Sequence, residues 1–141
     1  MNVLNRIIFV LLSMIGIQTI QAEIITYPSG VTPGSWLCFR KEILVEKNAS
    51  HNLFKIAADS KYWLWINGEL VVREGGLKRG PNPKDTYCDI LQNVKGFVAG
   101  KNTVTILVWY FGKEGFSHRN SPTAGVSVDM TIGKQQYVSD D

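Results

Sequence analysis

Residues 60 to 74 read SKYWLWINGELVVRE, and this stretch decides the fold. Its dipeptide Asn67-Gly68 supplies the positive backbone φ angles that a two-residue type I′ turn requires. The runs on either side are rich in aromatic and β-branched residues, which favour strands. The stretch therefore predicts a β-hairpin in which Ile66 lies opposite Glu69.

Two tryptophans of this hairpin, Trp63 and Trp65, share a predicted face with Leu70 and Val72. That face is wholly apolar, whereas the opposite face mixes apolar residues with charged ones such as Arg73. An apolar face left in water would promote aggregation. We therefore predict that both tryptophans fill the core. An exposed aromatic platform for a ligand is the alternative.

Apolar and polar residues alternate in further short runs bounded by Gly, Asn and Pro, as expected of half-buried strands. We count about seven strands of this kind. They fall near residues 36–45, 53–58, 60–66, 69–74, 86–91, 103–111 and 126–132. Short strands at this spacing predict an all-β fold, a β-sandwich.

The first 22 residues differ in kind from the rest. They carry one positive charge at Arg6, an apolar stretch over residues 7–17 and a small residue, Ala22, as a cleavage site. We predict a signal peptide at 1–22, a linker at 23–35 and one sandwich domain at 36–141. The mature protein is then expected to be secreted or periplasmic, with no membrane contact after cleavage. A retained N-terminal anchor is the alternative.

Composition argues against several classes of partner. The net charge is only +3, and the basic residues are scattered among acids, so nucleic acid is not an expected partner. With two His and no CxxC motif, no metal site and no cofactor are expected, although a structural Ca²⁺ is left open. Cys38 and Cys88 are expected as buried free thiols in strands, with a disulfide as the alternative.

Residues 74–87 (EGGLKRGPNPKDTY) and 112–125 (GKEGFSHRNSPTAG) form irregular segments, and loops on a β scaffold are often functional. In the strand before the second segment, Trp109 is expected on the outer side. An aromatic ring can stack on a sugar while polar groups bind its hydroxyls, and interdomain interfaces use the same residue types. The candidate carbohydrate or interdomain contacts are Arg79, Asn82, Asp85, Tyr87, Trp109 and His118.

No catalytic residue is predicted. The sequence has no GxSxG motif, and none of its acids pairs with another in a recognisable catalytic pattern.

Three segments together resemble a known family: FRKEI at 39–43, AADSKYWLWINGELVVREGGLKRGPNPKDTY at 57–87, and GKNTVTILVWYFGKEGFSHRNSPTAG at 100–125. They are similar to the N-terminal β-sandwich region of bacterial α-L-rhamnosidases, family 78 glycoside hydrolases, in particular secreted forms from Bacteroides-like bacteria. The resemblance implies a jelly-roll, galactose-binding-like sandwich, which could lack its last strand or strands at the C-terminus. In that case residues 126–132 would form an unpaired edge strand.

Members of that family are large multidomain enzymes that remove terminal α-L-rhamnose with inversion, through carboxylates on a downstream helical barrel. The resemblance therefore implies a non-catalytic accessory domain that does not hydrolyse rhamnosides by itself. Its implied partner is the catalytic domain or a rhamnose-containing glycan. A free-standing secreted carbohydrate-binding module and a structural domain with no glycan role are the alternatives.

Overall fold

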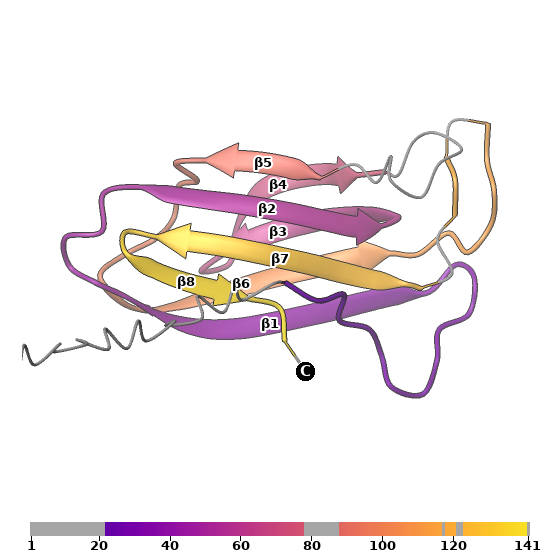
Figure 1. Ribbon diagram of the computed structural model, residues 1–141, viewed down its shortest axis with the longest axis horizontal. Helices are drawn as coiled ribbons and strands as arrows, with labels where there is room; N and C mark the ends of the chain where they lie inside the picture. The colour runs from indigo at the N-terminus through magenta and orange to yellow at the C-terminus, as the bar shows by residue number, and fades with distance from the viewer. Residues whose placement is uncertain (1–21, 78–87, 117, 121–122, 141) are drawn as a thin grey trace, which may run out of the picture.

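The computed structural model describes residues 22–77, 88–116, 118–120 and 123–140. Within these residues the chain forms two antiparallel four-stranded sheets, which face each other (Figure 1). One sheet has the strand order β1-β6-β3-β4 and the other β5-β2-β7-β8. The strands are β1 (Trp36–Val45), β2 (Asn52–Asp59), β3 (Lys61–Ile66), β4 (Glu69–Gly76), β5 (Asp89–Gln92), β6 (Gly100–Trp109), β7 (Gly125–Ile132) and β8 (Gln135–Val138). The predicted all-β sandwich is confirmed.

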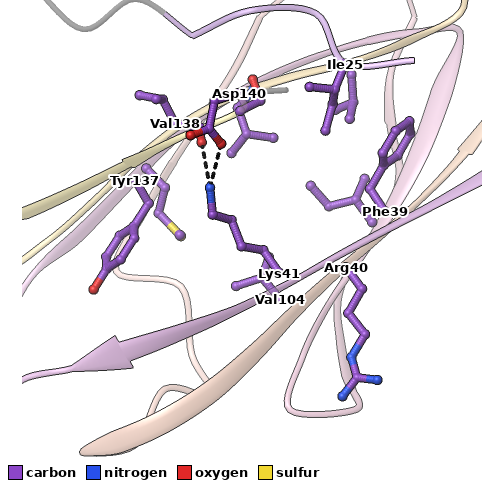
Figure 2. A pocket seen from close by; sticks show the side chains of 13 residues that line it. Ile25, Phe39, Arg40, Lys41, Val104, Tyr137, Val138 and Asp140 are labelled. Carbon is purple, nitrogen blue, oxygen red and sulfur yellow. Dashed lines mark hydrogen bonds and ion pairs between the residues drawn. The ribbon is translucent and has the colours of Figure 1, made fainter. Parts of the chain in front are cut away.

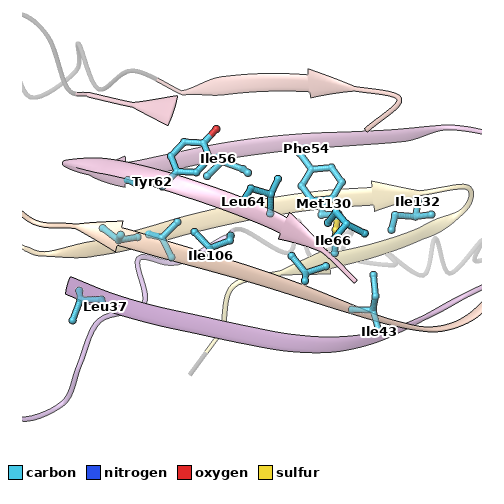
Figure 3. Packing of buried hydrophobic residues seen from close by; sticks show 14 of the residues in the cluster. Leu37, Ile43, Phe54, Ile56, Tyr62, Leu64, Ile66, Ile106, Met130 and Ile132 are labelled. Atoms are coloured by element: carbon cyan, nitrogen blue, oxygen red, sulfur yellow. The ribbon is translucent and has the colours of Figure 1, made fainter. Parts of the chain in front are cut away.

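The core lies between the two sheets, where buried side chains of β1, β2, β3, β6 and β7 meet (Figure 3). Phe54 and Ile56 of β2 and Val108 of β6 are fully buried there. Removing one such side chain from water stabilises the fold by roughly 1.5–3 kcal/mol. On β6 the intervening residues, Trp109 among them, lie on the outer side of the sheet, as predicted.

The β3–β4 hairpin turns where the sequence predicts. Asn67 and Gly68 have φ angles of 52° and 84°, and Ile66 pairs with Glu69. The Asn67 side chain also accepts a hydrogen bond from the backbone N–H of Thr103 at 2.8 Å. This contact joins the turn to β6, next to the hairpin in the same sheet.

The prediction that Trp63 and Trp65 fill the core is wrong. The side chains of Tyr62, Leu64 and Ile66 occupy the inner face of β3, and each is 0% exposed. Both tryptophans are half-buried on the outer face of the sheet. The alternative, an aromatic face outside the core, is the arrangement that the structure has.

A shift in the hairpin pairing explains this difference. The register slips on both sides of Leu64, which pairs with Val72, and Tyr62 pairs with Gly75. An unbroken register would place Tyr62 opposite the charged residue Arg73. The prediction therefore assigned the Tyr62 face of β3 to the outside of the sandwich. Because both faces of β3 are apolar, alternation alone does not decide which face is buried.

Strand β8 was not predicted, and it changes the position of β7. Residues 135–138 pair with β7, which therefore lies between β2 and β8. The prediction of an exposed edge strand at 126–132 is wrong for this reason. The N-terminal segment adds to this sheet, because Ile25 forms a bridge with Val126 and the Glu23 N–H donates to the Ser139 carbonyl.

Both cysteines are free and exposed, so the prediction of buried thiols is wrong. Cys38 lies on the outer face of β1, and Cys88 immediately precedes β5. Burial of part of its surface nevertheless raises the pKa of the Cys88 thiol above its ordinary value, with the nearby Asp89 charge acting in the same direction.

Apart from Ala22, the predicted signal peptide lies outside the described residues. Among those residues, the structure has no helix with the length and apolar character needed to cross a membrane. Export therefore stays a prediction.

Candidate functional site

Aromatic rings gather on the outer side of sheet β1-β6-β3-β4 and form what we call the aromatic cluster: Trp36, Trp63, Trp109 and Phe111. Trp36 and Trp109 are partners in the β1–β6 pairing, and their rings stack at a centroid distance of 5.1 Å and an interplanar angle of 6°. Trp63 lies 5.3 Å from Trp36 at a tilt of 37°. Phe111 places its ring at 73° to that of Trp109, with centroids 4.7 Å apart.

Trp36 is the outermost ring of the cluster. Its side chain is 52% exposed, whereas Trp63 and Trp109 are half-buried beside it. A ligand approaching the cluster would therefore meet Trp36 before Trp109. Trp109 was predicted as a contact and Trp36 was not, although Trp36 begins a predicted strand and lies on the same predicted face as Arg40 and Glu42.

An open groove lies beside Trp36, between the irregular N-terminal segment and the start of β1. We call it the Trp36 groove, and its volume is about 560 Å³. Aromatic rings, hydroxyl groups and aliphatic side chains contribute to its walls. The lining residues are Thr26, Tyr27, Gly30, Val31, Thr32, Ser35, Trp36, Leu37, Cys38 and Phe39.

The wall of the groove is fastened to the end of β6. The Gly34 N–H donates to the Tyr110 carbonyl, and the Tyr110 N–H donates to the Ser35 carbonyl, both at 2.9 Å. Pro33 packs so closely on Gly112 that a Cβ atom at position 112 would lie 2.6 Å from the Pro33 Cα. The irregular segment is therefore held in place by the same strand that carries Trp109.

His118, another predicted contact, is only 5% exposed. Its Nε2 atom lies 3.4 Å from the Ser60 Oγ and 3.8 Å from the Asp59 Oδ1. Its ring packs edge-on against Phe111 at a centroid distance of 5.2 Å. The structure thus connects Trp109 and the buried His118 through the ring of Phe111. A direct ligand contact by either residue stays a prediction.

The buried group of Asp59, Ser60 and His118 contains the residue types of a serine nucleophile and its base. However, the Ser60 hydroxyl donates its proton to Asp59 at 2.8 Å, and its oxygen accepts the Phe111 N–H at 3.1 Å. A catalytic serine instead gives its proton to the histidine and faces the substrate. Because Ser60 is 0% exposed, this group holds the chain together and is not a nucleophile site.

The remaining predicted contacts, Arg79, Asn82, Asp85 and Tyr87, lie outside the described residues. Hydrogen bonds of the Asp89 side chain connect the described residues that come before and after that segment. Its Oδ2 atom accepts hydrogen bonds from the Tyr62 hydroxyl at 2.7 Å and from the Gly76 N–H at 2.8 Å. Asp89 therefore connects β5 in one sheet with β3 and β4 in the other.

A second cavity of about 190 Å³ opens between the edge strands β1 and β8, and Figure 2 shows Lys41 reaching across it. The Lys41 Nζ donates to the Asp140 Oδ1 at 2.8 Å and to the Val138 carbonyl at 3.1 Å. The hydrogen bond and positive charge of Lys41 lower the pKa of the Asp140 carboxyl. The pair joins β1 to the residues that follow β8 on this side of the sandwich. Because both side chains are exposed, the ion pair contributes little to the stability of the fold.

Potential metal ligands are scattered in the described part of the chain. No group of three His, Cys, Asp or Glu side chains there could hold a metal ion. Asp85, the acid in the predicted contact segment, lies outside that part.

No family model matches this chain, and no curated protein matches it in sequence. Among solved structures, a GH78 family rhamnosidase of Bacillus sp. GL1 matches 85% of this chain with a TM-score of 0.72 at 24% identity. The Streptomyces avermitilis alpha-L-rhamnosidase complexed with L-rhamnose matches 84% with a TM-score of 0.62 at 16% identity. The alpha-L-rhamnosidase from Dictyoglumus thermophilum matches 73% with a TM-score of 0.55 at 21% identity.

The chain spans only 12%, 11% and 12% of these three proteins, respectively. TM-scores of 0.55 to 0.72 over this share of the chain establish a shared fold. The chain therefore has the fold of one region within these much larger rhamnosidases.

Proposed function

We propose that this chain is a non-catalytic accessory domain of an α-L-rhamnosidase-type glycoside hydrolase. The observation that carries the proposal is the structural match, which covers 85% of this chain but only 12% of a GH78 family rhamnosidase. A β-sandwich of this size lies within the usual size range of a domain, and such a domain can accompany a catalytic domain. In the described part of the chain, the segments similar to the family in sequence include residues of β1 to β4 and all of β6, and they support the same assignment.

The proposed role does not include catalysis. An inverting glycosidase needs two carboxyl groups about 6.5–9.5 Å apart across a sugar-binding cleft. In the described part of the chain, the lining of the Trp36 groove contains no carboxylate, and the cavity beside Lys41 contains Asp140 alone. The catalytic domain would supply the carboxylates, and its substrate would be a glycan with terminal α-L-rhamnose.

As an accessory domain of a secreted or periplasmic enzyme, the sandwich would contact the catalytic domain through exposed apolar side chains. Leu44 and Leu70 are 67% and 45% exposed and lie on β1 and β4. They lie at opposite edges of the sheet, so each would mark a separate candidate contact and not one patch. These positions are candidates for that interface.

The proposal is tested by sequencing the encoding DNA beyond the codon for Asp141. We expect downstream sequence, in frame or displaced by a shift, that specifies a helical catalytic barrel. Noncoding sequence in its place would contradict the assignment. The purified chain alone should release no product from an aryl α-L-rhamnoside. Hydrolytic activity that co-purifies with the chain would contradict the non-catalytic role.

A free-standing secreted carbohydrate-binding module is the second candidate function. It is favoured by the half-exposed Trp36 ring, because flat aromatic rings with nearby hydroxyl groups suit sugar binding. Noncoding sequence after Asp141 together with glycan binding would select it. Noncoding sequence without glycan binding would leave a structural domain with no glycan role.

A further inference from the structure

We propose that the Trp36 groove binds a neutral pyranose, with the apolar face of the sugar ring against the indole of Trp36. The proposal specifies the site and the ligand class for carbohydrate binding. It holds equally for a free-standing module and for a domain of an enzyme, so it does not depend on the rhamnosidase assignment.

The Trp36 ring is fixed in place without a ligand. It stacks in parallel on Trp109 at 5.1 Å and also contacts Trp63 at 5.3 Å, while 52% of its surface stays exposed. A flat ring that is already oriented loses little freedom when a sugar stacks on it. In contrast, Trp109 is covered by Trp36 and is contacted by Phe111, so it is less accessible as a stacking surface.

Hydroxyl groups line the same groove. Thr26, Thr32 and Ser35 are among its lining residues, and the Thr32 Oγ1 and Ser35 Oγ atoms lie 3.2 Å apart. A hydroxyl both donates and accepts hydrogen bonds, so it suits sugar hydroxyls in either role. Tyr27, which is 60% exposed, and Phe39 are two further aromatic residues of the lining. The groove thus combines an aromatic surface for C–H groups with hydrogen-bonding groups for hydroxyls.

The charge of the groove selects the ligand class. None of the described residues that line it is an Asp, Glu, Lys, Arg or His. A phosphate, sulfate or uronate would be held by cationic side chains, above all by Arg or Lys. The volume of about 560 Å³ lies within the usual range for small-molecule sites. A neutral pyranose, alone or within a neutral glycan, therefore matches the lining better than an anionic sugar does.

Isothermal titration calorimetry on the full chain tests the proposal. The probes are methyl α-L-rhamnoside, methyl β-D-glucoside, methyl β-D-galactoside and methyl α-D-mannoside, with polygalacturonate as the anionic comparison. We expect at least one neutral glycoside to bind and polygalacturonate to bind no better. The Trp36→Ala substitution should weaken that binding by up to about tenfold, since a stacked aromatic contact is worth up to about 1.5 kcal/mol.

Matched variants separate ligand contact from folding. Trp36→Phe keeps a flat ring and should retain more affinity than Trp36→Ala. Leu44→Ala removes another exposed apolar side chain from the same strand, outside the groove, and should leave the affinity within about twofold of the wild-type value. Thermal melting of each variant checks that the fold is intact.

The proposal is overturned if none of the four neutral glycosides binds, or if only polygalacturonate binds. It is also overturned if folded Trp36→Ala binds as tightly as the wild-type chain. A loss of affinity in Leu44→Ala equal to that in Trp36→Ala would place the site elsewhere on the sheet. None of these outcomes depends on the sequence after Asp141, so the proposal and the rhamnosidase assignment can fail separately.

Discussion

A single methyl group added at Gly75 should destabilise the sandwich strongly. A Cβ atom at this position would lie 2.4 Å from the Tyr62 Cζ and 2.6 Å from its Cε1, well inside van der Waals contact. Tyr62 is 0% exposed, and its hydroxyl donates to the Asp89 Oδ2 at 2.7 Å. The ring therefore has no free space to move into without weakening its bond to Asp89.

The expected cost of Gly75→Ala follows from these two effects. Overpacking a buried site costs about 1–3 kcal/mol. A weakened hydrogen bond to a charged acceptor adds up to about 1.5–3 kcal/mol. Because the ring can yield in part to either effect, we expect the free energy of unfolding to fall by about 2–5 kcal/mol. A loss of this size is a large part of the total stability of a typical domain, about 5–15 kcal/mol.

Urea unfolding of a double-mutant cycle measures the clash directly. Leucine at position 62 lacks the Cζ and Cε1 atoms, so Gly75→Ala should cost less than about 0.5 kcal/mol in a Tyr62→Leu background. Gly115→Ala is the control, because its nearest neighbour would be the His118 Cβ at an ordinary 3.7 Å. It should change the stability by less than about 1 kcal/mol. Equal costs of Gly75→Ala in both backgrounds would refute the steric explanation.

Three further predictions concern hydrogen bonds and ionisable groups. Asn102→Ala should lower the free energy of unfolding in urea by about 2–4 kcal/mol, because the side chain, 1% exposed, bonds both backbone groups of Val98; an unchanged midpoint would contradict this. NMR titration should give Asp140 a pKa below its ordinary value in the wild type and a higher pKa in Lys41→Met. Because the folded-state pKa is lowered, the stability from this pair is present above the unfolded pKa and is lost as the pH falls through the folded one. Burial raises the pKa of Cys88, so in Cys38→Ser a disulfide reagent at pH 8 should modify it more slowly in the folded chain than in urea; equal rates would oppose this.

The hairpin and the sandwich could be predicted because their signals are local. Asn67 and Gly68 fix the turn, and the alternation along β6 separates buried from outer residues. The buried face of β3 could not be predicted in the same way, because both of its faces are apolar. A slip in pairing around Leu64, which leaves no clear trace in the sequence, decided which face is buried.

The candidate site was harder to predict, because it depends on contacts between distant parts of the chain. Trp36 stacks on Trp109 only because β1 pairs with β6 in one particular register. Trp63 joins them because β3 pairs with the other side of β6. The Trp36 groove also needs the irregular residues 26–35, whose positions follow no periodic pattern. Sequence reasoning found Trp109, an inner member of the aromatic cluster, and missed the exposed one.

The central claim is that the aromatic cluster, with Trp36 outermost, is the surface that meets a sugar. The most direct test follows the indole N–H signals of the four tryptophans by NMR while methyl α-L-rhamnoside and the other neutral glycosides are added. We expect the Trp36 signal to shift most, the Trp63 and Trp109 signals to shift less, and the Trp65 signal to stay in place. Binding that shifts only backbone amides of residues 78–87, or an absence of any shift with all the glycosides, would contradict the claim.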